Sequence, residues 1–224
     1  SFMEVTRLDS NCAMAWWGMG MVLGPNYNAP LNPTSLAEIN NAMDKAVALS
    51  LNTTPKEKAL INALAKRFPR SEVKDMSPFN AAYAQAMKQA YEQFPDDMNI
   101  ATLYADALMN EHPWDLWEKN GNAKPWTPAI TALLEEIITK EPKHVGANHM
   151  YIHAVEASPE PGKALPSADK LQHLVPAAGH LVHMPSHIYI RTGHYHKGVL
   201  TNENAIMVDS TYVAQCKATG FYPM

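Results

Sequence analysis

The amino-acid sequence predicts an all-α protein made of stacked antiparallel helix pairs. Apolar residues recur at spacings of three and four along almost every patterned stretch, and good helix formers fill those stretches. Patterns typical of β-strands are nearly absent. Because one helix pair cannot bury its apolar face alone, successive pairs are expected to stack into an α-solenoid in which each pair contacts mainly its neighbours.

The expected helices follow one another along the chain with short polar breaks between them. Residues 2–9 (FMEVTRLD) are interpreted as the tail of a helix, and a helix over 13–21 follows the break at 8–11. Further helices are predicted over 35–49, 55–68, 81–94, 98–109, 128–138 and 195–208. The breaks FPDD (94–97) and EPKH (141–144) each precede a helix with an aromatic centre, at Tyr104 and Tyr151. These recurring breaks indicate a repeat of helix pairs.

One repeat-like stretch resembles the tetratricopeptide repeat (TPR) family. In residues 191–209 (RTGHYHKGVLTNENAIMVD), Gly193 and Tyr195 stand as in that family's turn and second helix, and LDSNCAMAWWGMG (8–20) resembles its repeat junction. The resemblance covers most of the chain, but the spacings exceed the family's period of about 34 residues. It therefore implies a TPR-like solenoid of irregular repeat length, with 23–33 and 112–128 as insertions.

Two strings are similar to those of a bacterial subfamily of TPR-like proteins. They are GANHMYIHAVEAS (146–158) and AGHLVHMPSHIYIRTG (178–193). The resemblance implies that these strings belong together, and it names no reaction. Since most such repeats are interaction modules, the fold implies a scaffold that binds a peptide or partner protein on its concave face.

Length and composition are those of a globular protein. The 224 residues suit one large domain or two small ones, and we expect a single TPR-like helical-repeat domain over 1–224, interpreted as a fragment of a longer chain. Hydrophobic residues make up 46% of the sequence and charged residues 18%. The net charge of −4 comes with no basic patch, so nucleic acid is not expected as a partner. Because no apolar run reaches about 18 residues, no membrane span is expected either.

The two cysteines, Cys12 and Cys216, lie almost at opposite ends of the sequence and form no CxxC or CxxCH pattern. A covalent c-type haem and a zinc ribbon are therefore not supported. A disulfide between the two is one interpretation in an oxidising compartment, and a pair of buried free thiols is the more ordinary one. The sequence leaves the compartment unknown, with a periplasmic or secreted location slightly favoured.

Seven of the ten histidines fall in two short stretches of the sequence, 149–153 and 180–196, and each stretch contains one cluster. In the first, His149 and His153 are four residues apart on an expected helix, and Glu156 is three residues further on. All three side chains therefore project from one helical face. The pattern is not the HExxH motif of metalloproteases, which places a glutamate beside the first histidine.

The second cluster contains His180, His183 and His187, whose spacings of three and four again place them on one helical stripe. Pro185 lies inside this stretch. It either kinks a continuous helix or begins a new one, with His180 and His183 in the preceding loop. Both clusters lie on first helices of consecutive repeats, which neighbour each other in a solenoid at about 8–10 Å between axes.

If the two clusters meet, their imidazoles can share one metal ion. His149, His153, His183 and His187 are the predicted metal ligands, and Glu156 and His180 are further ligands or proton carriers with a catalytic role. Zinc or copper is expected, and iron or nickel would accept similar ligands. The expected activity is metal-assisted hydrolysis or a redox reaction on a small-molecule substrate. In the alternative, the histidines are groove-lining polar groups of a non-catalytic scaffold.

The remaining histidines are assigned no chemistry. His194 and His196 fall at a turn and at the start of the next helix, and we expect them to be exposed. Three others lie near predicted helix ends, where a capping or surface role is the default: His112, His144 and His173.

Overall fold

The computed structural model describes residues 2–216 and confirms an all-α chain. Within that range, extended pairing is limited to two isolated bridges, Asn26 with Ala29 and Trp117 with Ala123. The chain divides into two compact units, the first ending at Trp114 and the second beginning at Asp115. None of the described helices is both long enough and apolar enough to cross a membrane.

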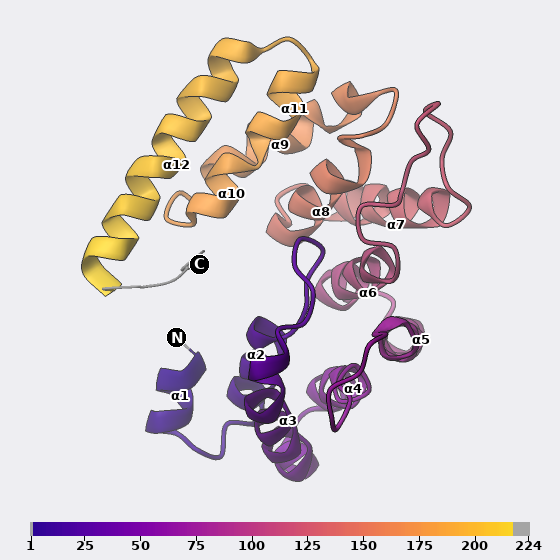
Figure 1. The fold of residues 1–224 in the computed structure, drawn as a ribbon, viewed down its shortest axis with the longest axis vertical. Coiled ribbons are helices and arrows are strands. Elements are labelled where there is room, and N and C mark those ends of the chain that lie inside the picture. Colours follow the sequence, from indigo (N-terminus) through magenta and orange to yellow (C-terminus); the bar gives the residue numbers. More distant parts are fainter. Residues whose placement is uncertain (1, 217–224) are drawn as a thin grey trace. The chain divides into compact units, whose positions relative to one another are not determined.

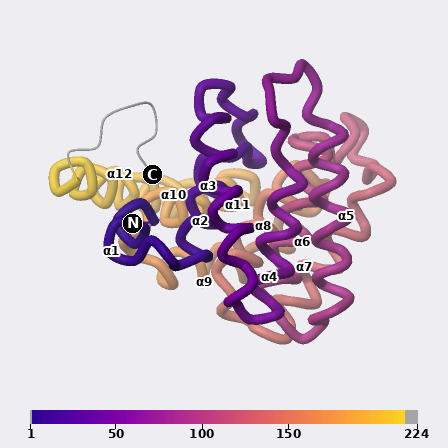
Figure 2. The backbone as a smooth tube through the Cα atoms, turned by 90° about the horizontal axis from the view of Figure 1, so that it is seen from below, coloured from indigo at the N-terminus to yellow at the C-terminus, as the bar shows by residue number. Residues whose placement is uncertain are grey.

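The first unit is a series of helices in which sequence neighbours pack together. Its α-helices are α1 (Phe2–Leu8), α2 (Ala13–Leu23), α3 (Leu36–Leu49), α4 (Pro55–Leu64), α5 (Ser77–Gln93) and α6 (Met98–Glu111), with short 3-10 helices η1 (Pro33–Ser35) and η2 (Ser50–Asn52). Helix α2 packs on α3, and α5 packs on both α4 and α6; α5 and α6 run alongside each other (Figure 2). Ile39, Met43, Leu64 and Met87 fill the core between them.

Two boundaries in the first unit differ from the sequence prediction. The helix predicted over 55–68 begins as expected, because Thr54 and Glu57 form a reciprocal capping box. It ends at Leu64, where the backbone tightens into i−3 hydrogen bonds ahead of Pro69. The helix predicted over 81–94 begins earlier, at Ser77, because Pro78 fits the first helical turn.

The second unit carries both histidine clusters. Its elements are α7 (Thr127–Lys140), α8 (Val145–Val155), η3 (Pro161–Ala164), α9 (Leu165–Leu174), α10 (Gly179–His183), α11 (Pro185–Arg191) and α12 (Tyr195–Cys216). Helix α8 packs between α7 and α9, and α11 packs on α9. Helix α12 lies along both α10 and α11 (Figure 1). The helix α9 was not predicted, and α12 continues beyond the expected end at residue 208.

The structure contains one feature of each interpretation of Pro185. Pro185 occupies the first turn of α11, as expected for a new helix. His180 and His183 nevertheless lie in a helix, α10, so their assignment to a loop was wrong. Met184 joins the two helices with helical backbone angles, so His180, His183 and His187 stay on one face of the two helices.

The helical class and the packing of adjacent helices are therefore confirmed, whereas the solenoid arrangement, the single domain over 1–224 and the TPR relationship stay predictions.

The cysteine prediction needs correction. Both cysteines are free thiols, but Cys12 is half-buried and Cys216, the last residue of α12, is exposed.

Candidate metal centre

Helix α8 presents the first histidine cluster. Its N-terminus is capped by His144, whose Nδ1 accepts a hydrogen bond from the Ala147 N–H at 3.1 Å, which confirms the capping role expected there. His149 and His153 follow one turn apart, with ring centroids separated by 5.0 Å. Glu156 directly follows the helix and keeps helical backbone angles, so its carboxylate stays on the same face.

The aromatic insertion of the second unit supports this helix. Trp117 Nε1–H donates to the carbonyl oxygen of Ala154, near the C-terminus of α8, at 2.7 Å. Trp126 Nε1–H donates to the Asp115 carbonyl oxygen at 2.8 Å. The two tryptophans thus have structural roles.

Helices α10 and α11 bring the second cluster against the first. The Nε2 atoms of His149 and His180 are 3.1 Å apart, and the ring centroids of these residues are separated by 5.0 Å. His187, on α11, lies with its ring centroid 5.7 Å from that of His153. The prediction that the two clusters meet in space is therefore confirmed.

Glu156 links the two clusters through both of its oxygens. His153 Nδ1 lies 2.9 Å from Oε1, and His187 Nδ1 lies 2.7 Å from Oε2. Burial alone would raise the pKa of the Glu156 carboxyl, but the hydrogen bonds from the two imidazoles outweigh burial and lower this pKa to about 2. The ionised carboxylate accepts an Nδ1–H from each ring, and an imidazole that donates its Nδ1–H offers Nε2 as its remaining ligand atom.

His183 completes the cluster from α10. Its Nε2 lies 3.0 Å from Nε2 of His187, and its Nδ1 lies 2.5 Å from Oδ1 of Asn202 on α12. The Asn202 amide is oriented by its Nδ2–H, which donates to the Gly198 carbonyl oxygen at 3.0 Å. Sequence reasoning missed Asn202, because only the packing of α12 on α10 brings it to His183 and no spacing in the sequence indicates this.

Two sets of three residues offer ligand atoms close enough for a metal ion. They are His149, His153 and His180, and His153, Glu156 and His187, with the atoms of each set within 4.8 Å of one another. In the second set, hydrogen bonds between the carboxylate and the two Nδ1 atoms already account for the proximity. The first set consists of imidazoles alone, which makes it the better candidate.

The distance between His149 and His180 fits two ligands of one ion. With metal–nitrogen bonds of about 2.0–2.1 Å, an Nε2–Nε2 separation of 3.1 Å corresponds to an angle at the metal of roughly 95–100°. That angle lies between the values for square-planar and tetrahedral coordination. The separation therefore suits copper(II) as well as zinc.

Burial holds the imidazoles in the form that binds metals. Burial, together with the neighbouring rings, lowers the pKa of His180 to about 4 and lowers the pKa of His149 well below its ordinary value. Both rings are therefore neutral near neutral pH, and neutral imidazole is the ligand form. The cluster is also open on one side, since the side chain of His153 is 2% exposed and that of His187 is 24% exposed.

The structure thus brings together all six residues that the sequence singled out as metal ligands or catalytic groups: His149, His153, Glu156, His180, His183 and His187. Of the four predicted metal ligands, His183 belongs to neither ligand set of the described residues, whereas His180, expected as a further ligand or proton carrier, lies in the first set. Glu156 accepts from two imidazoles. His194 and His196 are exposed, as predicted, and belong to neither ligand set found among the described residues.

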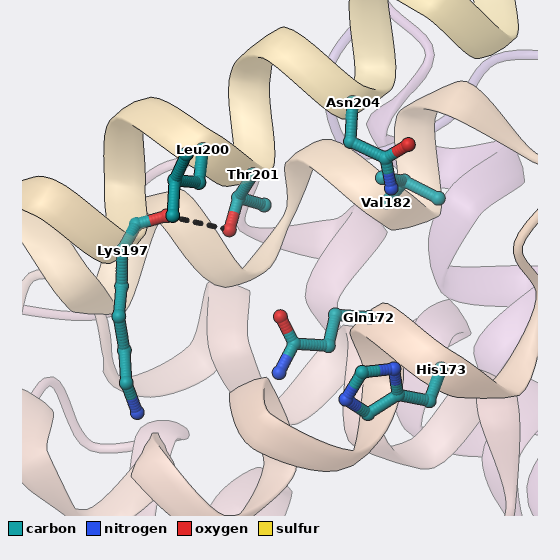
Figure 3. A pocket seen from close by; sticks show the side chains of 7 residues that line it. All are labelled: Gln172, His173, Val182, Lys197, Leu200, Thr201 and Asn204. Carbon is teal, nitrogen blue, oxygen red and sulfur yellow. Dashed lines mark hydrogen bonds between the residues drawn. The ribbon is translucent and has the colours of Figure 1, made fainter.

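A small pocket lies between α9, α10 and α12. It has a volume of about 190 Å³, and Gln172, Val182, Lys197 and Thr201 are among its lining residues (Figure 3). The Thr201 hydroxyl donates to the Lys197 carbonyl oxygen at 2.8 Å (Figure 3). The pocket is smaller than the roughly 300–1,000 Å³ typical of ligand sites, so we assign it no ligand.

Comparison with known proteins adds no family to this description. No family model matches the chain, and no curated protein matches it either. What the fold and the site define is a helical chain with a histidine cluster that could bind a metal ion.

Proposed function

We propose that this protein binds a divalent transition metal ion through His149, His153 and His180. The observation that carries the proposal is the convergence of these imidazoles, from α8 and α10, with their ligand atoms within 4.8 Å of one another. Three imidazoles at this spacing match the protein ligands of many catalytic metal sites.

Glu156 serves this site as a positioning residue. Metal-binding histidines commonly donate their second ring N–H to a carboxylate, which fixes the tautomer and the ring orientation. The Oε1 atom of Glu156 does this for His153 at 2.9 Å. A carboxylate engaged in this way orients the metal ligand instead of binding the ion itself.

Zinc or copper(II) is the ion that the ligand set favours. Imidazole ligands suit zinc, copper, iron and nickel, whereas thiolates would select softer ions. Neither cysteine belongs to a ligand set found among the described residues. The angle estimated at the metal fits zinc and copper(II) equally well.

The partial exposure of two ligands gives the site its chemistry. Three protein ligands leave a coordination position for water or substrate, as in catalytic zinc sites, and the half-buried rings of His149 and His180 provide access. When bound, zinc would lower the pKa of a coordinated water to about 7 and so supply a nucleophile for hydrolysis. We therefore propose hydrolysis of a small-molecule substrate, with a copper-dependent redox reaction as the corresponding activity if copper is the resident ion.

Metal binding is tested on the full chain with paired variants. The purified protein is stripped with a chelator, dialysed against zinc or copper(II) and analysed for bound metal. The variant His149→Ala with His180→Ala removes two ligands, and the variant His194→Ala with His196→Ala removes two exposed histidines as the matched control. We expect the wild type and the control to retain metal, and the ligand variant to lose the ion held by the three imidazoles.

A wild-type protein that retains no metal, and whose melting temperature is unchanged by chelator, would refute the proposal. The histidines would then be a hydrogen-bonded polar network, and the scaffold function expected from the sequence would be favoured.

A further inference from the structure

The rings of His183 and His187 face each other through their Nε2 atoms. The Nδ1 atom of each ring has a hydrogen-bond acceptor as its partner, so each ring carries its proton on Nδ1 and none lies between the two Nε2 atoms. Oε2 of Glu156 lies 2.7 Å from Nδ1 of His187, and a carboxylate oxygen at this distance accepts the Nδ1–H. Oδ1 of Asn202, an acceptor, lies 2.5 Å from Nδ1 of His183, so this nitrogen also carries its proton outward. A neutral imidazole protonated on Nδ1 has a bare lone pair on Nε2. Two bare Nε2 atoms at 3.0 Å repel each other unless a cation lies between them.

A metal ion fits between these two nitrogens. With metal–nitrogen bonds of about 2.0–2.1 Å, a separation of 3.0 Å corresponds to an angle at the metal of roughly 95°. This separation is nearly the same as the 3.1 Å between the Nε2 atoms of His149 and His180. The cluster therefore contains two pairs of facing nitrogens with the same geometry.

The second pair lies outside the ligand set of the first ion. Ligands of one ion at about 2.1 Å must lie within about 4.2 Å of one another. Among the described residues, the groups of ligand atoms within 4.8 Å of one another contain three residues each, and neither group includes His183. In the present arrangement His183 therefore cannot join the ion held by His149, His153 and His180.

We propose that the protein holds a second divalent metal ion between Nε2 of His183 and Nε2 of His187, so that the cluster is a dinuclear centre. His153 lies between the two sites, with ring centroids 5.0 Å from His149 and 5.7 Å from His187. With only two protein ligands, the second ion keeps several positions for water or for oxygen atoms of a substrate. Two neighbouring ions can stabilise both the attacking and the leaving oxygen of a displacement, which favours hydrolysis as the reaction.

This inference rests on the proposed function, and the stoichiometry of binding separates the two. The stripped full chain is dialysed against zinc at near-neutral pH, and bound zinc per chain is measured by elemental analysis. We expect two ions in the wild type and one in the variant His183→Ala with His187→Ala. The matched control, His194→Ala with His196→Ala, should retain both ions, because it loses two exposed histidines from the same region.

Each other outcome is decisive. One ion in both the wild type and the His183/His187 variant would overturn the second site and leave the first intact, with a shared proton as the cation between the rings. Two ions in that variant would overturn the assignment of the second ion to these residues. A wild type without zinc would overturn both proposals.

A measurement on the wild type alone covers the case in which the variant does not fold. Cadmium substitutes for zinc and reports each site by its own NMR resonance. We expect two resonances at shifts typical of nitrogen and oxygen ligands. A single resonance that does not change after excess cadmium is added would overturn the dinuclear centre.

Discussion

Replacing Glu156 by glutamine tests how the carboxylate prepares the metal ligands. The 6% exposed carboxylate accepts an Nδ1–H from His153 at 2.9 Å and from His187 at 2.7 Å. Glutamine has the same shape but only one acceptor oxygen, so its NH₂ group must face the other ring. That ring then carries its proton on Nε2, and its lone pair is lost to the metal.

The expected loss in metal affinity follows from this change of tautomer. Removing such an outer partner typically costs roughly 10–100-fold in affinity, which is about 1.4–2.7 kcal/mol. We expect Glu156→Gln to weaken zinc binding by this amount, measured by competition with a chromophoric chelator.

Glu135→Gln is the matched control for this measurement. Glu135 is also a carboxylate of the second unit and accepts the Tyr151 hydroxyl at 2.6 Å, but it belongs to neither ligand set found among the described residues. We expect its zinc affinity to equal that of the wild type. Equal affinities of Glu156→Gln and Glu135→Gln would refute the role assigned to Glu156.

Three further predictions concern stability. The metal-free protein should lose stability as the pH falls below about 6.5, because the unfolded chain then takes up protons that the folded His149 and His180, whose pKa values are lowered, do not bind. The loss from His180 should continue down to its folded pKa of about 4, and thermal melts that are flat between pH 7 and 4 would contradict this. Gly179→Ala should destabilise α10 by about 1–3 kcal/mol and weaken metal binding, because the added Cβ would lie 1.7 Å from Oδ1 of Asp209. Urea unfolding should show a lower midpoint than that of the wild type, and an unchanged midpoint would refute this prediction. Trp117→Phe should cost about 1 kcal/mol by removing the hydrogen bond to the end of α8, and a melting temperature equal to that of the wild type would exclude this support.

The helical class was predictable because the periodic pattern is a local property of the sequence. The spacing of four between His149 and His153 placed both side chains on one helical face, and the structure bears this out. The meeting of the two clusters was predicted from the expected neighbourhood of successive helices. The Nε2–Nε2 contact of His149 with His180 confirms this step.

The details of the site depend on contacts that local patterns do not encode. The sequence left open whether Pro185 kinks one helix or begins another, and the structure has both a helix over His180 and His183 and a new helix at Pro185. Asn202 comes to His183 only through the packing of α12 along α10. Glu156 was expected as a ligand or proton carrier, and only the distances to its two imidazole partners indicate a positioning role.

The most direct test of the histidine cluster as a metal centre is an anomalous difference map from crystals of the full chain grown with zinc. We predict a strong peak about 2.1 Å from ring nitrogens of His149, His153 and His180. A map with no peak among these rings, or with zinc only at the exposed His194 and His196, would contradict the account.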